Sequence, residues 1–204
     1  VSIPNAINTE LFRPQDKRLA REAFHLPVDK YLLLFGCQRI TDKRKGFSFL
    51  VEALQLIKQQ SPDRALNIEL VVVGGEAEHI RHQVPFGIFP ISYVRDPQKM
   101  VQLYNAVDLY VTPSLQDNLP NTTMEAMACG TPCVGFKVGG IPEMIDHKEN
   151  GYVATCQDAK DFAAGIQWAL DADHGALSQR ARDKVMSTYS EEAVARKYME
   201  VYEG

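Results

Sequence analysis

The sequence lacks several features that would each define a class of protein. Its 204 residues contain no apolar run long enough to span a membrane, so no membrane-spanning helix is expected. It has no block of lysine and arginine, and its formal net charge of -4 argues against a general nucleic-acid binder. The four cysteines include no Cys-x-x-Cys pair, and the five histidines lack the spacing of a zinc site. We therefore predict reduced, mostly buried cysteines, no metal site and no nucleic-acid partner, in a cytoplasmic protein.

The order of apolar segments predicts alternating strands and helices. A hydrophobic content of 45% is enough for one domain with a sizeable core. Several of the expected strands are continuous apolar runs, which are typical of buried parallel strands. The expected strands are residues 31–35, 67–74, 87–91, 107–111, 131–136 and 150–154. Because helical patterns separate these strands and then finish the chain, we predict an α/β fold. It is a Rossmann-like, doubly wound parallel sheet with helices on both faces and a helical C-terminal tail.

Residues 111–130 combine the end of a strand, a polar loop and the start of a helix. The helix entry at residues 120–122 leaves backbone N–H groups free to bind an anion such as a phosphate. Asp117 and Glu125 flank the same loop, where carboxylates can accept hydrogen bonds from paired sugar hydroxyls. The pattern suggests a nucleotide or a nucleotide sugar. On these residues alone, two carboxylates that merely stabilise a turn and a helix start are an equally good interpretation.

A second strand–loop–helix unit carries basic residues. The strand at 31–35 runs into Gly36, and Arg39 and Lys45 follow before the next helix. In a doubly wound sheet such loops lie at the carboxyl edge, where ligands bind. The planar guanidinium of Arg39 and the ammonium of Lys45 both suit a diphosphate. The alternative is an exposed basic loop without a ligand.

Together these motifs resemble those of the bacterial group 1, or family 4, retaining GT-B glycosyltransferases. Residues 117–132 resemble the acidic-x7-Glu motif of that family, with Asp117 where members usually carry Glu. Residues 36–46 resemble its Gly-Arg-(x4–5)-Lys-Gly motif, and residues 103–114 resemble L-Y-x-x-A-D-x-x-V-x-P-S. Residues 139–143 resemble Gly-Gly-x-Pro-Glu, a glycine pair that would let the backbone approach a ligand closely. The resemblance covers nearly the whole chain.

The opening segment, residues 1–14, resembles the stretch that leads into the second domain of GT-B enzymes. We therefore expect residues 1–15 to be an interdomain linker. Residues 16–204 are expected to be the C-terminal nucleotide-sugar-binding domain, a fragment whose N-terminal acceptor domain is absent. Since the acceptor site would lie on the missing domain, the fragment alone is predicted to bind donor weakly and to transfer no sugar.

The resemblance implies a role for each motif. Arg39 and Lys45 would neutralise the diphosphate of the donor and of the leaving nucleoside diphosphate, and Asp117 would face the transferred sugar. These three are the candidate catalytic residues. Glu125 would accept hydrogen bonds from the ribose, and the backbone of residues 118–122 would bind sugar hydroxyls and phosphate. Beyond Glu125, the candidate donor-binding residues are Gly36, Gly74, Val94, Arg95, Asn118, Leu119, Pro120, Asn121 and Thr122.

The reaction implied by the resemblance is retaining transfer of a hexose-type sugar to a glycan or lipid-linked acceptor in cell-surface polysaccharide biosynthesis. The donor would be a UDP-, GDP- or ADP-sugar, with its base near Val94 and Arg95, and neither cofactor nor metal is expected. The same resemblance allows peripheral association of the full-length protein with the inner face of the plasma membrane. Two alternatives remain open: a non-catalytic nucleotide-sugar-binding module, and another GT-B activity such as an epimerase or a phosphorylase.

Overall fold

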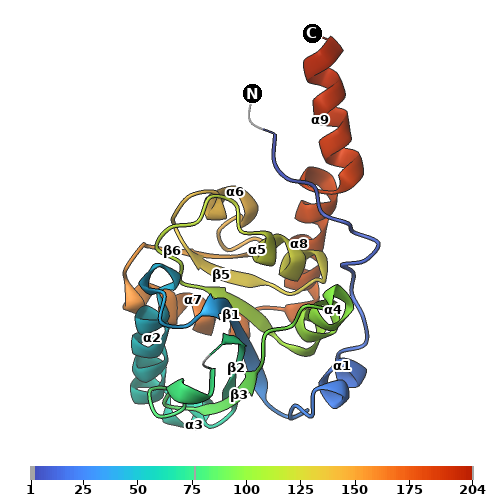
Figure 1. The fold of residues 1–204 in the computed structure, drawn as a ribbon. Helices are drawn as coiled ribbons and strands as arrows, with labels where there is room; N and C mark the ends of the chain where they lie inside the picture. The colour runs from blue at the N-terminus through green and yellow to red at the C-terminus, as the bar shows by residue number, and fades with distance from the viewer. Residues whose placement is uncertain (1–2, 76, 204) are drawn as a thin grey trace.

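The computed structural model describes residues 3–75 and 77–203 and places six parallel strands in one sheet (Figure 1). The strands are β1 (Tyr31–Arg39), β2 (Ile68–Gly75), β3 (Gly87–Ile91), β4 (Leu109–Thr112), β5 (Cys133–Phe136) and β6 (Gly151–Ala154). They follow the order β3-β2-β1-β4-β5-β6, and all neighbouring strands are parallel. The strand order therefore reverses between β1 and β4, which is the place where doubly wound sheets bind ligands.

Helices cover both faces of this sheet. The α-helices are α1 (Lys17–Ala23), α2 (Phe47–Gln60), α3 (Pro62–Ala65), α4 (Pro97–Ala106), α5 (Asn121–Ala128), α6 (Ile141–Met144), α7 (Ala159–Asp171), α8 (His174–Thr188) and α9 (Glu191–Glu203). Two short 3-10 helices, η1 (Lys43–Lys45) and η2 (Ala77–Ile80), follow β1 and β2. The helices α2 and α7 pack on one face, and α1, α4, α5 and most of α8 pack on the other. The predicted doubly wound fold with a helical C-terminal tail is confirmed.

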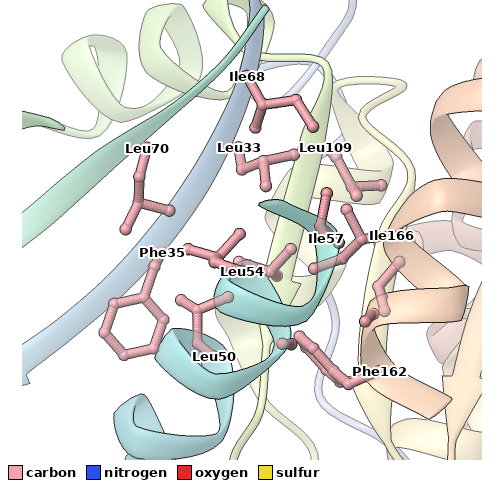
Figure 2. Packing of buried hydrophobic residues seen from close by; sticks show 14 of the residues in the cluster. Leu33, Phe35, Leu50, Leu54, Ile57, Ile68, Leu70, Leu109, Phe162 and Ile166 are labelled. Atoms are coloured by element: carbon pink, nitrogen blue, oxygen red, sulfur yellow. The ribbon is translucent and has the colours of Figure 1, made fainter. Parts of the chain in front are cut away.

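Side chains of the central strands alternate between the two cores. In β1, Leu33 belongs to the core under α2 and α7, whereas Leu32 belongs to the core under α4 and α5. Figure 2 shows Leu33 in the same core as Leu50 of α2 and Phe162 of α7, and all three side chains are fully buried. Burying a side chain of this size contributes roughly 1.5–3 kcal/mol. Because both faces are covered, the strand needs apolar residues at successive positions, which explains its continuous apolar run.

The central strand β1 is longer than predicted. The expected strand covers residues 31–35, but β1 continues to Arg39, which pairs with Gly75 of β2 after a register shift. The neighbouring Gly74 has a φ of +144°, and a Cβ at this position would overlap the carbonyl oxygen of Cys37. The glycines at the end of β2 thus let the two strands stay close, and the extended β1 carries Arg39 to the carboxyl edge of the sheet.

A buried ion pair joins α1 to the amino end of the sheet. A guanidinium nitrogen of Arg21 lies 2.7 Å from a carboxylate oxygen of Asp108, and another donates to the carbonyl of Ala106 at 2.8 Å. Asp108 also accepts the N–H of Leu32 at 2.7 Å and the ammonium of Lys17 at 2.8 Å. One carboxylate therefore connects α1, the start of β1 and the start of β4.

The opening segment lies beside the last two helices. The N–H of Ile7 donates to the carbonyl of Tyr189 at 2.9 Å, and Arg182 of α8 donates to the carbonyl of Phe12 at 2.9 Å. Figure 1 shows α9 projecting beyond the sheet, next to this segment. No helix in the described part of the chain is long and apolar enough to cross a membrane.

Candidate functional site

A cavity of about 1130 Å³ lies at the carboxyl ends of the central strands. Its walls come from the ends of β1 and β4, the loops after β1 and β3, the helix α4, the start of α5 and the opening segment. This position is the switch point between β1 and β4, where a ligand is expected. Pockets for small molecules measure roughly 300–1,000 Å³, so the cavity suits an extended ligand of the size of a nucleotide sugar.

The cavity brings together candidate residues that lie far apart in the sequence. Those that line it are Gly36, Arg39, Lys45, Val94, Arg95, Asp117, Thr122 and Glu125. The candidates outside its described lining are Gly74, Asn118, Leu119, Pro120 and Asn121. The three candidate catalytic residues and the candidate ribose acceptor therefore share one cavity, while most of the expected anion-binding loop lies beside it.

Two cations stand on the wall made by β1 and η1. The side chain of Arg39 is exposed, and no carboxylate of the described residues forms an ion pair with it. The ammonium of Lys45 lies 3.1 Å from a carboxylate oxygen of Asp117, and both side chains are half-buried. Arg44 also lines the cavity, but it is paired with Asp42 at 2.7 Å, and this hydrogen bond lowers the pKa of Asp42. Arg44 binds both carboxylate oxygens of Asp42, at 3.1 and 2.7 Å, whereas Lys45 makes a single contact with Asp117 at 3.1 Å. Arg39 and Lys45 are thus the cations of this wall that an anionic ligand can use.

Another wall is the start of α5. The helices α1, α4, α7 and α8 each begin with an aspartate whose side chain accepts a backbone N–H. In contrast, α5 begins after Pro120, with no hydrogen bond from a capping side chain. The N–H groups of Thr123 and Met124 donate to the carbonyl of Pro120, so the positive dipole end and the N–H groups of the first two residues remain available. Thr122 and Glu125 are three residues apart on this helix and both line the cavity.

Two buried tyrosines that are not among the candidates predicted from the sequence hold these polar side chains. The hydroxyl of Tyr104 donates to Glu125 Oε2 at 2.8 Å, and the hydroxyl of Tyr110 donates to Thr122 Oγ1 at 2.9 Å. Burial raises the pKa of Glu125, although the hydrogen bond from Tyr104 opposes this change. A buried tyrosine hydroxyl needs a partner, and that requirement is the signal that could have drawn attention to them.

The glycine pair of residues 139 and 140 contacts the acidic loop. The N–H of Gly140 donates to the carbonyl of Asn118 at 2.5 Å, and a Cβ at Gly139 would overlap the carbonyl oxygen of Asp117. Gly139 also has a φ of +48°, in the left-handed region. The glycine pair was expected to let the backbone approach a ligand closely. In this structure it approaches the backbone of the loop that carries Asp117. The pair fixes the position of the loop beside the cavity.

A third wall is largely apolar. It contains Val94, which is half-buried on the loop after β3, and Met100 of α4. The exposed Tyr93 and two residues of the opening segment, Leu11 and Phe12, complete it. The contribution of the opening segment was not predicted from the sequence. An apolar wall next to a cationic wall suits a ligand with a flat heterocycle at one end and negative charge in the middle.

The candidate residues do not include a metal site. Among the described residues, no group of three or more His, Cys, Asp or Glu side chains could hold a metal ion. The positive charge that the cavity offers an anion therefore comes from side chains and from the start of α5. The independence of the reaction from metals stays a prediction.

Comparison with known proteins defines the family. The family model of the group 1 glycosyl transferases matches residues 29–172, which include all candidate residues. The D-inositol 3-phosphate glycosyltransferase 2 of Catenulispora acidiphila is 32% identical over 180 residues, which make up 82% of this chain and 42% of that protein. The chain therefore belongs to the group 1 glycosyltransferases, as its motifs predicted.

Solved structures agree with the GT-B architecture. A sucrose-phosphate synthase from Thermosynechococcus elongatus is similar with a TM-score of 0.81 and 29% identity, over 98% of this chain and 51% of that chain. The Anabaena protein HepE, solved in complex with UDP-glucose, has a TM-score of 0.79 at 20% identity, over 98% of this chain and 56% of that chain. The latter likeness shows the fold alone. The chain spans about half the length of the relatives that it matches, and its fold is that of a GT-B C-terminal domain.

Proposed function

We propose that the cavity binds a nucleotide-diphosphate-sugar donor for retaining transfer of a hexose-type sugar. One observation carries this proposal: two cations, Arg39 and Lys45, line the same cavity at the switch point as the start of α5 and a carboxylate, Glu125. The cations and the start of α5 bind the diphosphate, since both provide positive potential. Glu125 accepts hydrogen bonds from the ribose hydroxyls.

The same cations assist the chemical step. When the bond between the sugar and the diphosphate breaks, the electron pair stays on the leaving nucleoside diphosphate, whose extra charge Arg39 and Lys45 stabilise. Asp117 lies 3.1 Å from Lys45 and faces the transferred sugar. It is one methylene shorter than glutamate, and its ion pair with Lys45 keeps both groups at the point where the sugar meets the diphosphate.

The base of the donor lies against the apolar wall near Val94 and Arg95. The two ends of the cavity then match the two ends of the nucleotide, with the base on apolar side chains and the diphosphate on the cations. The HepE complex with UDP-glucose supports a UDP-sugar as the first donor to test, followed by GDP- and ADP-sugars.

The acceptor is a glycan or a lipid-linked glycan, bound by a part of the full-length protein outside these residues. The names of the relatives include an inositol-phosphate glycosyltransferase and an amylovoran biosynthesis glycosyltransferase, so acceptors differ within the family. We place this protein in cell-surface polysaccharide biosynthesis, in the cytoplasm, with peripheral association at the inner face of the plasma membrane.

The experiment that tests this function is a transfer assay with the full-length protein. UDP-, GDP- and ADP-hexoses are supplied in turn with a glycolipid extract, and release of nucleoside diphosphate is measured with and without the extract. We expect one donor to be consumed in an acceptor-dependent way, and no transfer by the 204-residue chain alone. Binding without turnover by the full-length protein would favour a non-catalytic module, and turnover that needs free phosphate would favour a phosphorylase.

As the pH is lowered, nucleotide affinity is expected to decrease at a higher pH than it would with a glutamate of ordinary pKa at position 125. Burial raises the pKa of Glu125 above its usual value of 4.5, and the ionised carboxylate is the better acceptor of ribose hydrogen bonds. Affinity is therefore complete above the raised pKa and decreases as the pH falls through it. Titration calorimetry from pH 8 to pH 4.5 measures the effect. The Glu125→Gln variant, whose amide does not titrate, is the control, and equal pH dependence in both proteins would contradict the role of Glu125.

A further inference from the structure

The contact between Tyr104 and Glu125 joins the hydrophobic core to the cavity. Tyr104 lies on α4 and is 0% exposed, and its hydroxyl donates to Glu125 Oε2 at 2.8 Å. Both residues line the cavity. In the described part of the chain, Tyr104 is the side chain that donates to this carboxylate. One carboxylate oxygen is therefore occupied by the protein, which leaves Oε1 for a ligand.

The side chain of Tyr104, which donates this hydrogen bond, is held in place by its own contacts. The ring of Tyr104 makes an edge-to-face contact with the ring of Tyr110, with centroids 6.0 Å apart and planes at 81°. Its backbone carbonyl accepts a hydrogen bond from Thr131 Oγ1 at 2.7 Å. Burial raises the pKa of Tyr104 well above its usual value, so the hydroxyl keeps its proton at any working pH. Tyr104 thus offers a fixed hydrogen-bond donor to Glu125.

A fixed donor on one oxygen restricts the orientation of the whole carboxylate. The side chain of glutamate has three rotatable torsions, and without a partner Glu125 would sample several rotamers on the cavity wall. With Oε2 held by Tyr104, Oε1 keeps one position relative to the start of α5. Preorganised hydrogen-bonding groups discriminate between ligands because they need not be ordered during binding.

We propose, on the basis of the donor site described above, that Tyr104 is a positioning residue that orients Glu125 to select a ribose with free hydroxyls. Tyr104 acts through Glu125, whose Oε2 accepts its hydroxyl. Its removal should therefore change the preference for ribonucleotides over dideoxynucleotides, and not only the overall affinity. A residue with a merely structural role would weaken both ligands equally.

The test measures this preference in the 204-residue chain by titration calorimetry. The probes are UDP, GDP and ADP, each against its 2′,3′-dideoxy counterpart, and the readout is the ratio of the two Kd values for the nucleotide that binds. We expect the wild-type protein to prefer the ribonucleotide at least about tenfold, because hydrogen bonds to a charged group are involved. Tyr104→Phe should reduce the preference to about threefold or less.

Tyr152→Phe is the matched control. Its hydroxyl also donates to a carboxylate, Asp161, at 2.7 Å, but neither residue lines the cavity. This variant should keep the wild-type preference. Glu125→Asp moves the ribose acceptor itself, so its preference should fall whether or not Tyr104 positions the carboxylate, and this variant tests the acceptor alone.

The outcomes separate this assignment from the proposed function. If UDP, GDP and ADP all fail to bind the wild-type protein, both are overturned. If a ribonucleotide binds but Tyr104→Phe keeps the wild-type preference, the role of Tyr104 is overturned while the donor site survives. A loss of preference in Tyr104→Phe, with the preference kept in Tyr152→Phe, supports the assignment.

Discussion

Replacing Lys45 by alanine in the full-length protein is expected to lower kcat/KM for sugar transfer by about 100-fold or more. Removing one preorganised group that stabilises developing charge typically costs about 10²–10³ in rate. Here the loss is compounded, since Lys45 is the partner of Asp117 at 3.1 Å. Without the ammonium, the carboxylate remains near the diphosphate and repels it. The effect should appear both in nucleotide binding and in turnover.

Lys43 provides a matched control for this prediction. It lies in the same 3-10 helix, η1, and is exposed, but it does not line the cavity. Lys43→Ala should change kcat/KM by less than about twofold, because exposed lysines seldom contribute to a site that they do not reach. Initial rates at several donor concentrations measure both variants. Equal losses in Lys43→Ala and Lys45→Ala would mean that only the overall charge of η1 matters.

The largest effect on stability is expected from Asp108→Ala. This carboxylate pairs with Arg21 at 2.7 Å, where the arginine side chain is 5% exposed, and it accepts the N–H of Leu32. Removing one partner of a buried ion pair costs about 3–5 kcal/mol, because the remaining charge stays buried without compensation. We therefore expect the free energy of unfolding to fall by about that amount, measured by urea denaturation followed by circular dichroism.

A surface ion pair serves as the reference. Asp171 lies 2.6 Å from Arg64, a similar distance, but the side chain of Asp171 is 66% exposed. Asp171→Ala should lower the free energy of unfolding by about 1 kcal/mol or less, since water screens such pairs. If the two aspartate variants are equally stable, the network around Asp108 does not hold α1 on the sheet.

The fold could be predicted from the sequence because its strands are strongly patterned. The apolar run at 31–35 and the one that precedes Gly74 each sit between two helical layers, so their composition alone identifies buried parallel strands. The polar continuation of β1 to Arg39 could not be predicted in this way. It depends on pairing with Gly75 of β2, which is a tertiary contact.

The charged residues of the candidate site could be predicted from the sequence. Arg39, Lys45, Asp117 and Glu125 stand out as polar residues after strands and at a helix start, and the structure brings them to one cavity. Tyr104 was not recognised because a buried aromatic residue in a helix has the same sequence pattern as a core residue. Its polar role depends on which side chain meets its hydroxyl, and that is set by the packing of α4 on α5.

The contact of the glycine pair with the acidic loop illustrates the same limit. Residues 139 and 140 indicate a close approach of backbone, but the sequence does not specify the partner. In the structure the N–H of Gly140 meets the carbonyl of Asn118. Asn118 and Gly140 are 22 residues apart along the chain, and the pairing of β4 with β5 makes their segments neighbours.

Whether the cavity binds a nucleotide through the residues named here is tested most directly by titrating the 204-residue chain with UDP, GDP and ADP. The titrations are repeated with Lys45→Ala and Glu125→Ala, which remove the diphosphate cation and the ribose acceptor. We predict that one nucleotide binds the wild-type chain and that its heat signal is lost in both variants. Binding that persists unchanged in both would contradict the donor site and would place the nucleotide elsewhere.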